Sequence, residues 1–322
     1  MSATPTRRDV LLGSAAALAA SAAVATAAAP RPGFGLCLNT STVRSADGKS
    51  RPIVESIAIA SQAGFRALEP WVSEVEEYVK AGGTLADLGK RLADAGLVVP
   101  NAIGFAEWIV GDPGRRKKGL EQAKRDFDLV RRIGCGRLAA PPVGATGGTS
   151  KRDDGKPAEP PVDLLAAADR YRELFELGRA LGVTPLVEVW GFSRTFKRLG
   201  ETLLVAAESG VEGAAVLPDI YHLYKGGSDF AGLKLLAPTA IGIFHVNDYP
   251  QIDRDAIGDA DRVYPGDGVA PLASVLKNLH ASGYAGYLSV ELFNRGYWNQ
   301  DPHVVAKTAR EKLQAVIVKA LA

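Results

Sequence analysis

The 322-residue sequence has few cysteines, few histidines and little net charge, and each shortage narrows the class of protein. Its two cysteines, Cys37 and Cys135, lie in apolar contexts, which favours buried free thiols over a disulfide between them. The formal net charge of +2 is too small to predict a nucleic-acid partner or an anionic membrane partner. The glycine-rich turn of a dinucleotide-binding domain is absent after the first expected strand, and no tandem repeat occurs.

The first 29 residues are expected to be an export signal that is not part of the fold. Arg7 and Arg8 precede an alanine-rich apolar run that extends to about Ala29. A charged start, an apolar middle and small residues at the end are typical of a secretory signal, and the arginine pair is similar to the twin-arginine type. A membrane anchor is the alternative, but the run is only weakly apolar. We therefore expect a periplasmic or secreted protein with no stable membrane association after cleavage.

Residues 30–322 alternate between short apolar runs and amphipathic stretches, which predicts a parallel sheet covered by helices. The expected strands cover residues 33–38, 65–69, 97–103, 137–140, 184–188, 214–219, 241–248 and 287–291. The expected helices cover residues 53–63, 73–80, 84–95, 115–133, 162–181, 202–209, 230–236, 271–282 and 302–321. Eight strand–helix units without a break in composition predict one α/β domain, a closed (β/α)₈ TIM barrel, and about 290 residues is a typical length for it.

Two long polar segments interrupt this alternation. Residues 141–161 run through glycine, proline and charged residues with no periodicity, which is too long for a routine connection. We expect a mobile or lid-like insertion there, at the mouth of the barrel. Residues 249–265 form a second long polar loop after the seventh expected strand.

Four consecutive expected strands end on a carboxylate or an imidazole: Glu188, Asp219, His245 and Glu291. The carboxyl ends of parallel strands in a barrel converge, so these side chains are expected to meet. Three carboxylates so close together raise one another's pKa values, and a divalent cation removes that conflict. Three oxygen ligands and one imidazole suit Mn²⁺, Mg²⁺, Co²⁺ or Zn²⁺, and the oxygen-rich set favours Mn²⁺.

Other polar and aromatic residues near strand ends are candidates for substrate contacts. His222 and Asp248 each follow a strand-end residue by three positions, and Glu69 ends the second expected strand. Structural alternatives are a loop-capping role for His222, an ion pair with an arginine for Glu69, and orientation of His222 or of the metal ligands for Asp248. Tryptophans near the strand outlets favour a carbohydrate pocket, although each could instead pack under a loop: Trp71, Trp108, Trp190 and Trp298.

These motifs resemble those of the xylose isomerase-like superfamily, which includes the family 2 type of abasic-site endonuclease. They are Glu188, D-x-x-H from Asp219, H-x-x-D from His245 and S-V-E ending at Glu291, and the layout covers nearly the whole chain after the signal. The branch of sugar epimerases, hydroxypyruvate isomerases and inosose dehydratases is the most similar. The resemblance implies that these four residues bind one divalent metal. It also implies that Glu188 and Glu291 move the substrate proton and that His222 contacts a substrate oxygen.

The sequence departs from the keto-sugar 3-epimerases of this superfamily at two positions. Those enzymes carry a second glutamate shortly after the first metal-binding glutamate, where this chain has Arg194. They also carry an arginine six residues after the metal-binding histidine, where this chain has Gln251, with Arg254 further on. The resemblance therefore implies the metal site but does not fix the reaction.

The expected function is that of a divalent-metal-dependent isomerase or epimerase of a free sugar or keto-sugar. A carboxylate would remove the proton on the carbon next to a metal-bound carbonyl, and an enediolate would form on the metal. The alternative is a lyase with the same site, which would dehydrate an inosose or eliminate the β-substituent of a 3-keto-glycoside. An exported enzyme meets glycosides more readily than sugar phosphates, which motivates this alternative.

Two further classes of protein fit the sequence less well. An abasic-site endonuclease of this superfamily needs a three-zinc site with several more histidines, whereas this chain has four in all. A sugar-binding protein without activity is disfavoured because the proton-transfer carboxylates are present. The expected partner is a small sugar or keto-sugar, and assembly into a homo-oligomer stays open.

Overall fold

The computed structural model describes residues 33–146 and 160–322. The expected export signal at residues 1–29 lies outside these ranges, as does most of the expected insertion at residues 141–161. Among the described residues, no helix combines the length and the apolar character needed to cross a membrane.

Parallel strands occur in eight places in the described ranges and match the eight strands predicted from the sequence. They are β1 (Gly35–Asn39), β2 (Ala67–Glu69), β3 (Ala102–Ile103), β4 (Arg137–Ala140), β5 (Thr184–Glu188), β6 (Ala215–Leu217), β7 (Phe244–Val246) and β8 (Tyr287–Val290). They form two four-stranded sheets with the orders β2-β1-β8-β7 and β3-β4-β5-β6. Isolated parallel bridges connect β2 to β3, through Trp71 and Ile103, and β6 to β7, through Asp219 and His245. The ring is thus closed, and the predicted α/β TIM barrel is confirmed.

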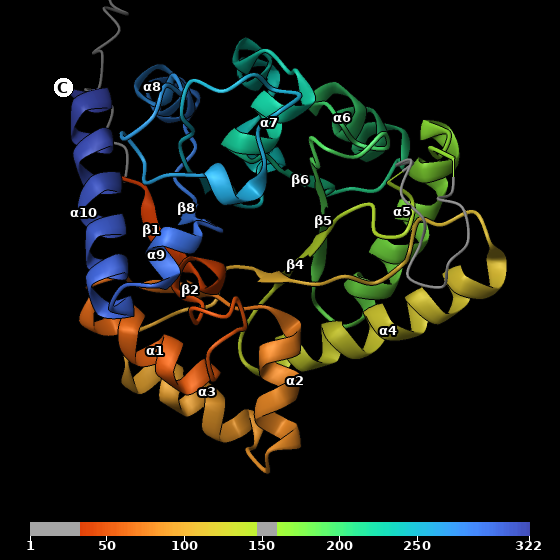
Figure 1. Cartoon of the computed structure of the whole chain (residues 1–322). Helices are drawn as coiled ribbons and strands as arrows, with labels where there is room; N and C mark the ends of the chain where they lie inside the picture. Colours follow the sequence, from red (N-terminus) through yellow and green to blue (C-terminus); the bar gives the residue numbers. More distant parts are fainter. Residues whose placement is uncertain (1–32, 147–159) are drawn as a thin grey trace, which may run out of the picture. The chain divides into compact units, whose positions relative to one another are not determined.

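Helices surround the outside of these strands (Figure 1). The α-helices are α1 (Ile53–Gln62), α2 (Val72–Lys80), α3 (Leu85–Asp94), α4 (Pro113–Arg132), α5 (Leu164–Ala180), α6 (Leu199–Glu208), α7 (Ile220–Gly226), α8 (Leu272–Ser282), α9 (Arg295–Trp298) and α10 (Pro302–Leu321). Short 3₁₀ helices are η1 (Thr40–Val43), η2 (Phe230–Leu235), η3 (Pro238–Ala240) and η4 (Asp259–Asp261). Aspartates start several of the long helices: the Asp112 side chain accepts a hydrogen bond from the backbone N–H of Arg115, and Pro113 follows it at the first helical position.

Several expected elements differ from the structure. The strand expected at residues 97–103 is reduced to two residues, because Pro100 has no N–H to donate to the ladder. The helix expected at residues 230–236 is the 3₁₀ helix η2, which is only six residues long. The strand expected at residues 241–248 is only the three residues of β7.

The buried apolar residues form two layers. One layer fills the space between the strands and the surrounding helices. The other fills the inside of the barrel with small and medium side chains: Cys37, Ala67, Ile103, Ala139, Leu186, Ala215, Leu217 and Ile243. Cys37 and Cys135 are both free and buried, as predicted. Polar side chains lie at the carboxyl ends of the strands instead, and these build the candidate site.

Candidate metal centre

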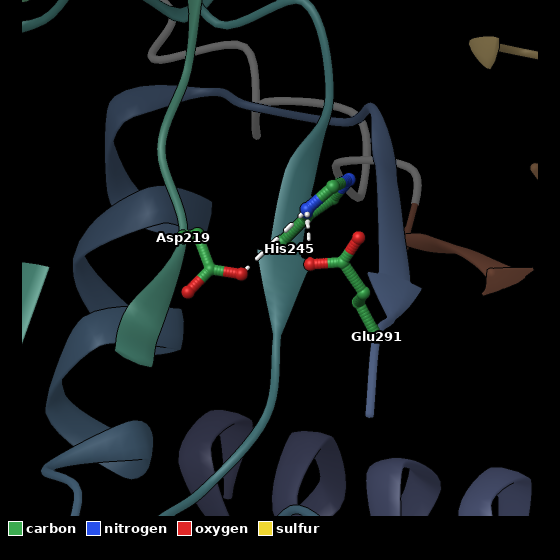
Figure 2. A group of neighbouring side chains, drawn as sticks. All are labelled: Asp219, His245 and Glu291. Atoms are coloured by element: carbon green, nitrogen blue, oxygen red, sulfur yellow. Dashed lines mark ion pairs between the residues drawn. The ribbon is translucent and has the colours of Figure 1, made fainter. Parts of the chain in front are cut away.

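Three of the four predicted metal ligands meet at the carboxyl ends of β6, β7 and β8. Asp219 follows β6, His245 is the middle residue of β7, and Glu291 comes directly after β8. The Nδ1 atom of His245 lies 3.6 Å from Oδ2 of Asp219 and 3.2 Å from Oε2 of Glu291. Figure 2 shows the two carboxylates on either side of this imidazole nitrogen. All three residues are buried, and their ligand atoms lie within 4.8 Å of one another.

Local backbone structure fixes the orientation of Asp219. Its Oδ1 accepts a hydrogen bond from the backbone N–H of His222 (2.8 Å), so Asp219 caps the start of α7. Its Oδ2 accepts one from the side-chain amide of Asn247 (3.0 Å) and faces His245. Burial raises the pKa of Asp219, but the charge of Arg262 outweighs this effect and lowers the pKa. Asp219 is therefore held as a carboxylate that points one oxygen into the cluster.

Glu69 contacts the imidazole nitrogen of His245 that is not in the cluster, Nε2. Its carboxylate lies 3.0 Å from Nε2 of His245 and also accepts hydrogen bonds from Asn39 (2.8 Å), Asn101 (2.8 Å) and Ser289 (2.6 Å). Burial would raise the pKa of Glu69, but His245 and these donors outweigh it and lower the pKa. Because Glu69 is fully buried and does not line the pocket, the expected contact of Glu69 with substrate is not met. It orients the imidazole instead.

The tautomer of His245 decides whether the donor set can hold a divalent cation. Since Glu69 accepts the proton on Nε2, the lone pair of His245 is on Nδ1, which faces two carboxylates and has no hydrogen-bond partner among the described residues. A lone pair facing two anions is stable only with a proton or a metal ion between them. Burial lowers the pKa of His245, but Glu69 and Glu291 outweigh it and raise this pKa well above its ordinary value. The residues present fit a divalent cation.

Glu188 lies beside this cluster and not within it. It ends β5 as predicted and lines the same pocket, yet it is not one of the described residues whose ligand atoms group within 4.8 Å. Its Oε2 is buried and has no partner in residues 33–146 and 160–322. Burial, and then the charges of Glu291 and Asp219, raise the pKa of Glu188 to about 8 although His245 opposes them. This carboxyl group can therefore hold or release a proton near neutral pH.

A cavity of about 200 Å³ opens above these groups. Its lining combines charged or polar residues with aromatic ones: Trp71, Ile103, Phe105, Glu188, Trp190, Phe192, His222, Asp259, Arg262, Glu291 and Phe293. The ring centroids of Trp71 and Phe105 are 4.8 Å apart, and those of Trp190 and Phe192 are 5.0 Å apart. A larger cavity of about 600 Å³ lies between residues 49–54 and α2, but no metal-ligand cluster of the described residues adjoins it.

The predicted substrate contacts divide into two groups. His222, Trp190 and Trp71 line the cavity. Trp108 does not, because it is buried and donates its indole N–H to the carbonyl of Pro141. Trp298 is likewise buried, with its indole N–H bonded to the backbone of Ser41.

Asp248 does not line the cavity either, and no hydrogen bond joins it to His222 among the described residues. Its carboxylate accepts hydrogen bonds from the backbone N–H groups of Tyr249, Gly266 and Ala270. It therefore organises the loop after β7, and its expected roles as a substrate contact and as a support of His222 are not met.

His222 is buried between two donors. Its Nδ1 accepts a hydrogen bond from the backbone N–H of Gly191 (3.3 Å), and its Nε2 lies 3.2 Å from Nη2 of Arg262. Burial lowers the pKa of His222 despite the nearby Asp219. A neutral imidazole has one lone pair, so His222 cannot accept from both groups at once.

Arg262 is one of the site residues that sequence reasoning missed; Phe192, Asp259 and Phe293 in the cavity lining are others. Arg262 is 1% exposed, and its Nη1 lies 3.1 Å from Oδ2 of Asp219 and 2.9 Å from Oε2 of Glu291. Its Nη2 donates to Oδ1 of Asp259 (2.6 Å), and its guanidinium lies 4.3 Å from the ring centroid of Tyr221. The only sequence signal is a polar D-A-D-R run inside a long loop, and no strand end or periodic spacing marks it.

The fold, the cluster at the strand ends and the pocket together define a parallel α/β barrel with a candidate metal site. The model of one family, described as xylose isomerase-like TIM barrel, matches residues 57–316. The chain therefore belongs to the xylose isomerase-like TIM barrel family, and the resemblance expected from the strand-end motifs is confirmed.

Curated relatives and solved structures agree with this assignment. The inosose isomerase of Bacillus velezensis is 24% identical over 292 residues, which is 88% of this chain and 97% of that protein. The 3-dehydroshikimate dehydratase of Pseudomonas aeruginosa is 26% identical over 256 residues, which is 77% of this chain but only 37% of that longer protein. The crystal structure of the IolI protein with a zinc atom has a TM-score of 0.78 at 19% identity and covers 89% of this chain and 99% of its own, which shows a common fold. The prediction of an isomerase-type enzyme agrees with the names of these relatives.

Proposed function

We propose that this protein is a divalent-metal-dependent isomerase or epimerase of a sugar or keto-sugar, which acts by removing the proton next to a carbonyl group. The observation that carries the proposal is the meeting of Asp219, His245 and Glu291 beside Glu188, a carboxyl group with a pKa of about 8. The names of the relatives, among them an inosose isomerase, support the same class of reaction.

The cation would be held by Asp219, His245 and Glu291, with Glu188 as the proposed fourth ligand. When bound, it would polarise a carbonyl group and make the neighbouring C–H bond more acidic. The oxygen-rich donors favour Mn²⁺, and Mg²⁺, Co²⁺ and Zn²⁺ also suit them. The zinc atom of the IolI structure belongs to a protein of the same fold and adds support for a divalent ion.

The proton-transfer groups are proposed to be Glu188 and Glu291. They line the cavity from β5 and β8, which are separated by two strands around the barrel, so they reach a bound substrate from different sides. Return of the proton to the neighbouring carbon gives isomerisation, and return to the opposite face gives epimerisation.

The remaining lining residues are proposed to bind the substrate. His222 can donate Nε2–H to a substrate oxygen, because its Nδ1 accepts from Gly191. Trp190 and Phe192 offer an apolar wall to the C–H face of a sugar ring, and Phe192 is 46% exposed at the cavity. We also propose that residues 1–29 direct the protein to the periplasm by the twin-arginine route.

A lyase that uses the same groups is the second candidate. The relative named 3-dehydroshikimate dehydratase favours it, because loss of water also starts with removal of a proton next to a carbonyl group. In that case the electron pair of the broken C–H bond forms a carbon–carbon double bond, the β C–O bond breaks, and the leaving oxygen takes up a proton and departs as water or an alcohol.

The test is proton exchange in D₂O, followed by NMR, with keto-sugars, inososes and 3-keto-glycosides as substrates and with metal analysis of the protein. We expect deuterium next to the carbonyl of an unchanged carbon skeleton. Glu188→Gln and Glu291→Gln should each lower the exchange rate at least about 100-fold, since general acid–base groups contribute 10²–10⁴-fold. Glu77→Gln, at an exposed position of α2, is the control and should exchange like the wild type.

The products separate the two candidates. Release of water or of an aglycone identifies the lyase. Exchange that persists in both glutamine variants contradicts the assignment of the bases. Failure of the metal-loaded protein to exchange a proton in any of these substrates contradicts the proposed function.

A further inference from the structure

Arg262 bridges the two carboxylates that are proposed to bind the metal ion. Its Nη1 lies 3.1 Å from Oδ2 of Asp219 and 2.9 Å from Oε2 of Glu291, and these are the same oxygens that face Nδ1 of His245. The positive charge of the guanidinium thus lies beside the two carboxylate oxygens that would bind a metal cation. A divalent ion binds carboxylate oxygens at about 2.0–2.2 Å, closer than any hydrogen-bond donor.

The two cations would repel each other at this distance. A doubly charged ion held by Asp219 and Glu291 would lie within a few ångströms of the guanidinium in a site from which water is largely excluded, where charges interact strongly. Both cations would also draw on the same oxygen lone pairs. The arrangement of Arg262 therefore opposes the arrival of the ion.

Two N–H groups of the Arg262 guanidinium lack a good hydrogen-bond acceptor, which lowers the cost of moving the side chain away from the carboxylates. Its Nε is buried and has no hydrogen-bond partner in the described part of the chain. Its Nη2 lies 3.2 Å from Nε2 of His222, whose other nitrogen already accepts from Gly191, so two N–H donors face each other there. A buried donor without an acceptor costs free energy.

The backbone of Arg262 is fixed, which confines any movement to the side chain. The neighbouring Val263 exchanges two backbone hydrogen bonds with Asp248 (2.9 and 3.0 Å), and the Arg262 carbonyl accepts one from Asn294 (3.0 Å). The side chain has a third anionic partner in Asp259, which is 42% exposed and also lines the cavity. Rotation of the side chain towards Asp259 would keep that ion pair while freeing the two carboxylates.

We propose that Arg262 is an internal competitor of the metal ion: its guanidinium neutralises Asp219 and Glu291 until a divalent ion replaces it. This inference rests on the metal centre of the proposed function. Arg262 lowers the affinity for the ion and also prevents two buried carboxylates from repelling each other. In this role Arg262 transfers no proton.

The test compares metal binding by the wild type, Arg262→Gln and Arg254→Gln after treatment with a chelator, by calorimetric titration with Zn²⁺ and with Mn²⁺. We expect Arg262→Gln to bind the ion at least about tenfold more tightly, because a unit of repelling charge is removed. Arg254→Gln is the matched control: this arginine is in the same loop, but it is exposed and lies over the ring of Tyr224. Its dissociation constant should equal that of the wild type.

Thermal unfolding gives a second measurement that does not depend on activity. Without added ion, Arg262→Gln should melt at a lower temperature than the wild type, because two buried carboxylates have lost their partner. Saturating ion should close this gap. If the variant folds only with metal present, its rate of metal loss to a chelator replaces the titration and should be slower than that of the wild type.

Equal or weaker binding by Arg262→Gln would overturn the inference. Weaker binding would mean that Arg262 orients the ligands, a role whose loss commonly lowers metal affinity 10- to 100-fold. Absence of binding by both the wild type and Arg262→Gln would instead refute the metal centre, and the inference with it. Binding by both at equal strength leaves the metal centre intact and refutes only the competition.

Discussion

Asp126 in α4 is a buried carboxylate outside the proposed site. Its Oδ2 has no hydrogen-bond partner among residues 33–146 and 160–322. Burial, and then the charge of Glu76, raise the pKa of Asp126 to about 7. The protonated form is therefore the one that the folded protein favours, and this makes the stability of the barrel depend on pH.

We expect the stabilising effect of proton uptake by Asp126 to be fully present below its unfolded pKa, about 3.9, and to be lost as pH rises through about 7. A shift of this size corresponds to up to about 4 kcal/mol. Asp126→Asn should remove this contribution, so the difference in free energy of unfolding between variant and wild type should move in favour of the variant from pH 4 to pH 8. Urea unfolding at several pH values measures it. A difference that stays constant with pH would contradict the assigned pKa.

The site residues differ in how far the sequence could predict them. Asp219, His245 and Glu291 each end an apolar run, and the convergence of parallel strands follows from the barrel alone. Arg262 comes from an irregular loop, and its place depends on the backbone bonds between Val263 and Asp248. No periodic pattern encodes such bonds, so the arginine could not be found before the structure.

Helix boundaries were more predictable than strand boundaries, because helix ends carry local sequence signals and strand ends depend on pairing with distant residues. The helix at Pro113–Arg132 carries a capping aspartate and a proline at its start, which are local signals. The strand expected at residues 97–103 was wrong in length, because its apolar run contains Pro100: the ladder with β4 covers only Ala102 and Ile103, and Val98 pairs only by an isolated bridge. Apolar character alone does not show where ladder hydrogen bonds stop.

Two helical glycines, Gly119 in α4 and Gly89 in α3, differ in the space that is available to a side chain. A Cβ added at Gly119 in α4 would lie 2.5 Å from the backbone of Glu107, whereas one added at Gly89 in α3 would find no atom closer than 4.0 Å. We expect Gly119→Ala to lower the free energy of unfolding by about 1–3 kcal/mol. Gly89→Ala should raise it by about 0.5–1 kcal/mol through the gain in helix propensity. Denaturant unfolding measures both, and a loss of stability in Gly89→Ala would contradict the packing.

The barrel as a whole has two places where only isolated bridges join its sheets. One lies between β2 and β3, and the other lies between β6 and β7. The candidate metal centre spans the second place, since Asp219 follows β6 while His245 and Glu291 belong to the other sheet. A bound ion would therefore connect the two sheets where hydrogen bonding between them is sparse.

Hydrogen exchange with and without a divalent ion tests this connection. At the β6–β7 junction the backbone N–H groups of His245 and Gly242 donate to Pro218 and Val216 across 3.0 Å each. We expect saturating ion to slow their exchange more than that of Ile103, whose N–H donates to Pro70 (3.0 Å) at the β2–β3 junction. An ion that binds only the native state raises global stability by about 2.7 kcal/mol at 100 times its dissociation constant, which protects every core amide. The informative quantity is therefore how much more the exchange slows at the β6–β7 junction than at the β2–β3 junction. Equal slowing at both junctions would show that the ion does not join the sheets.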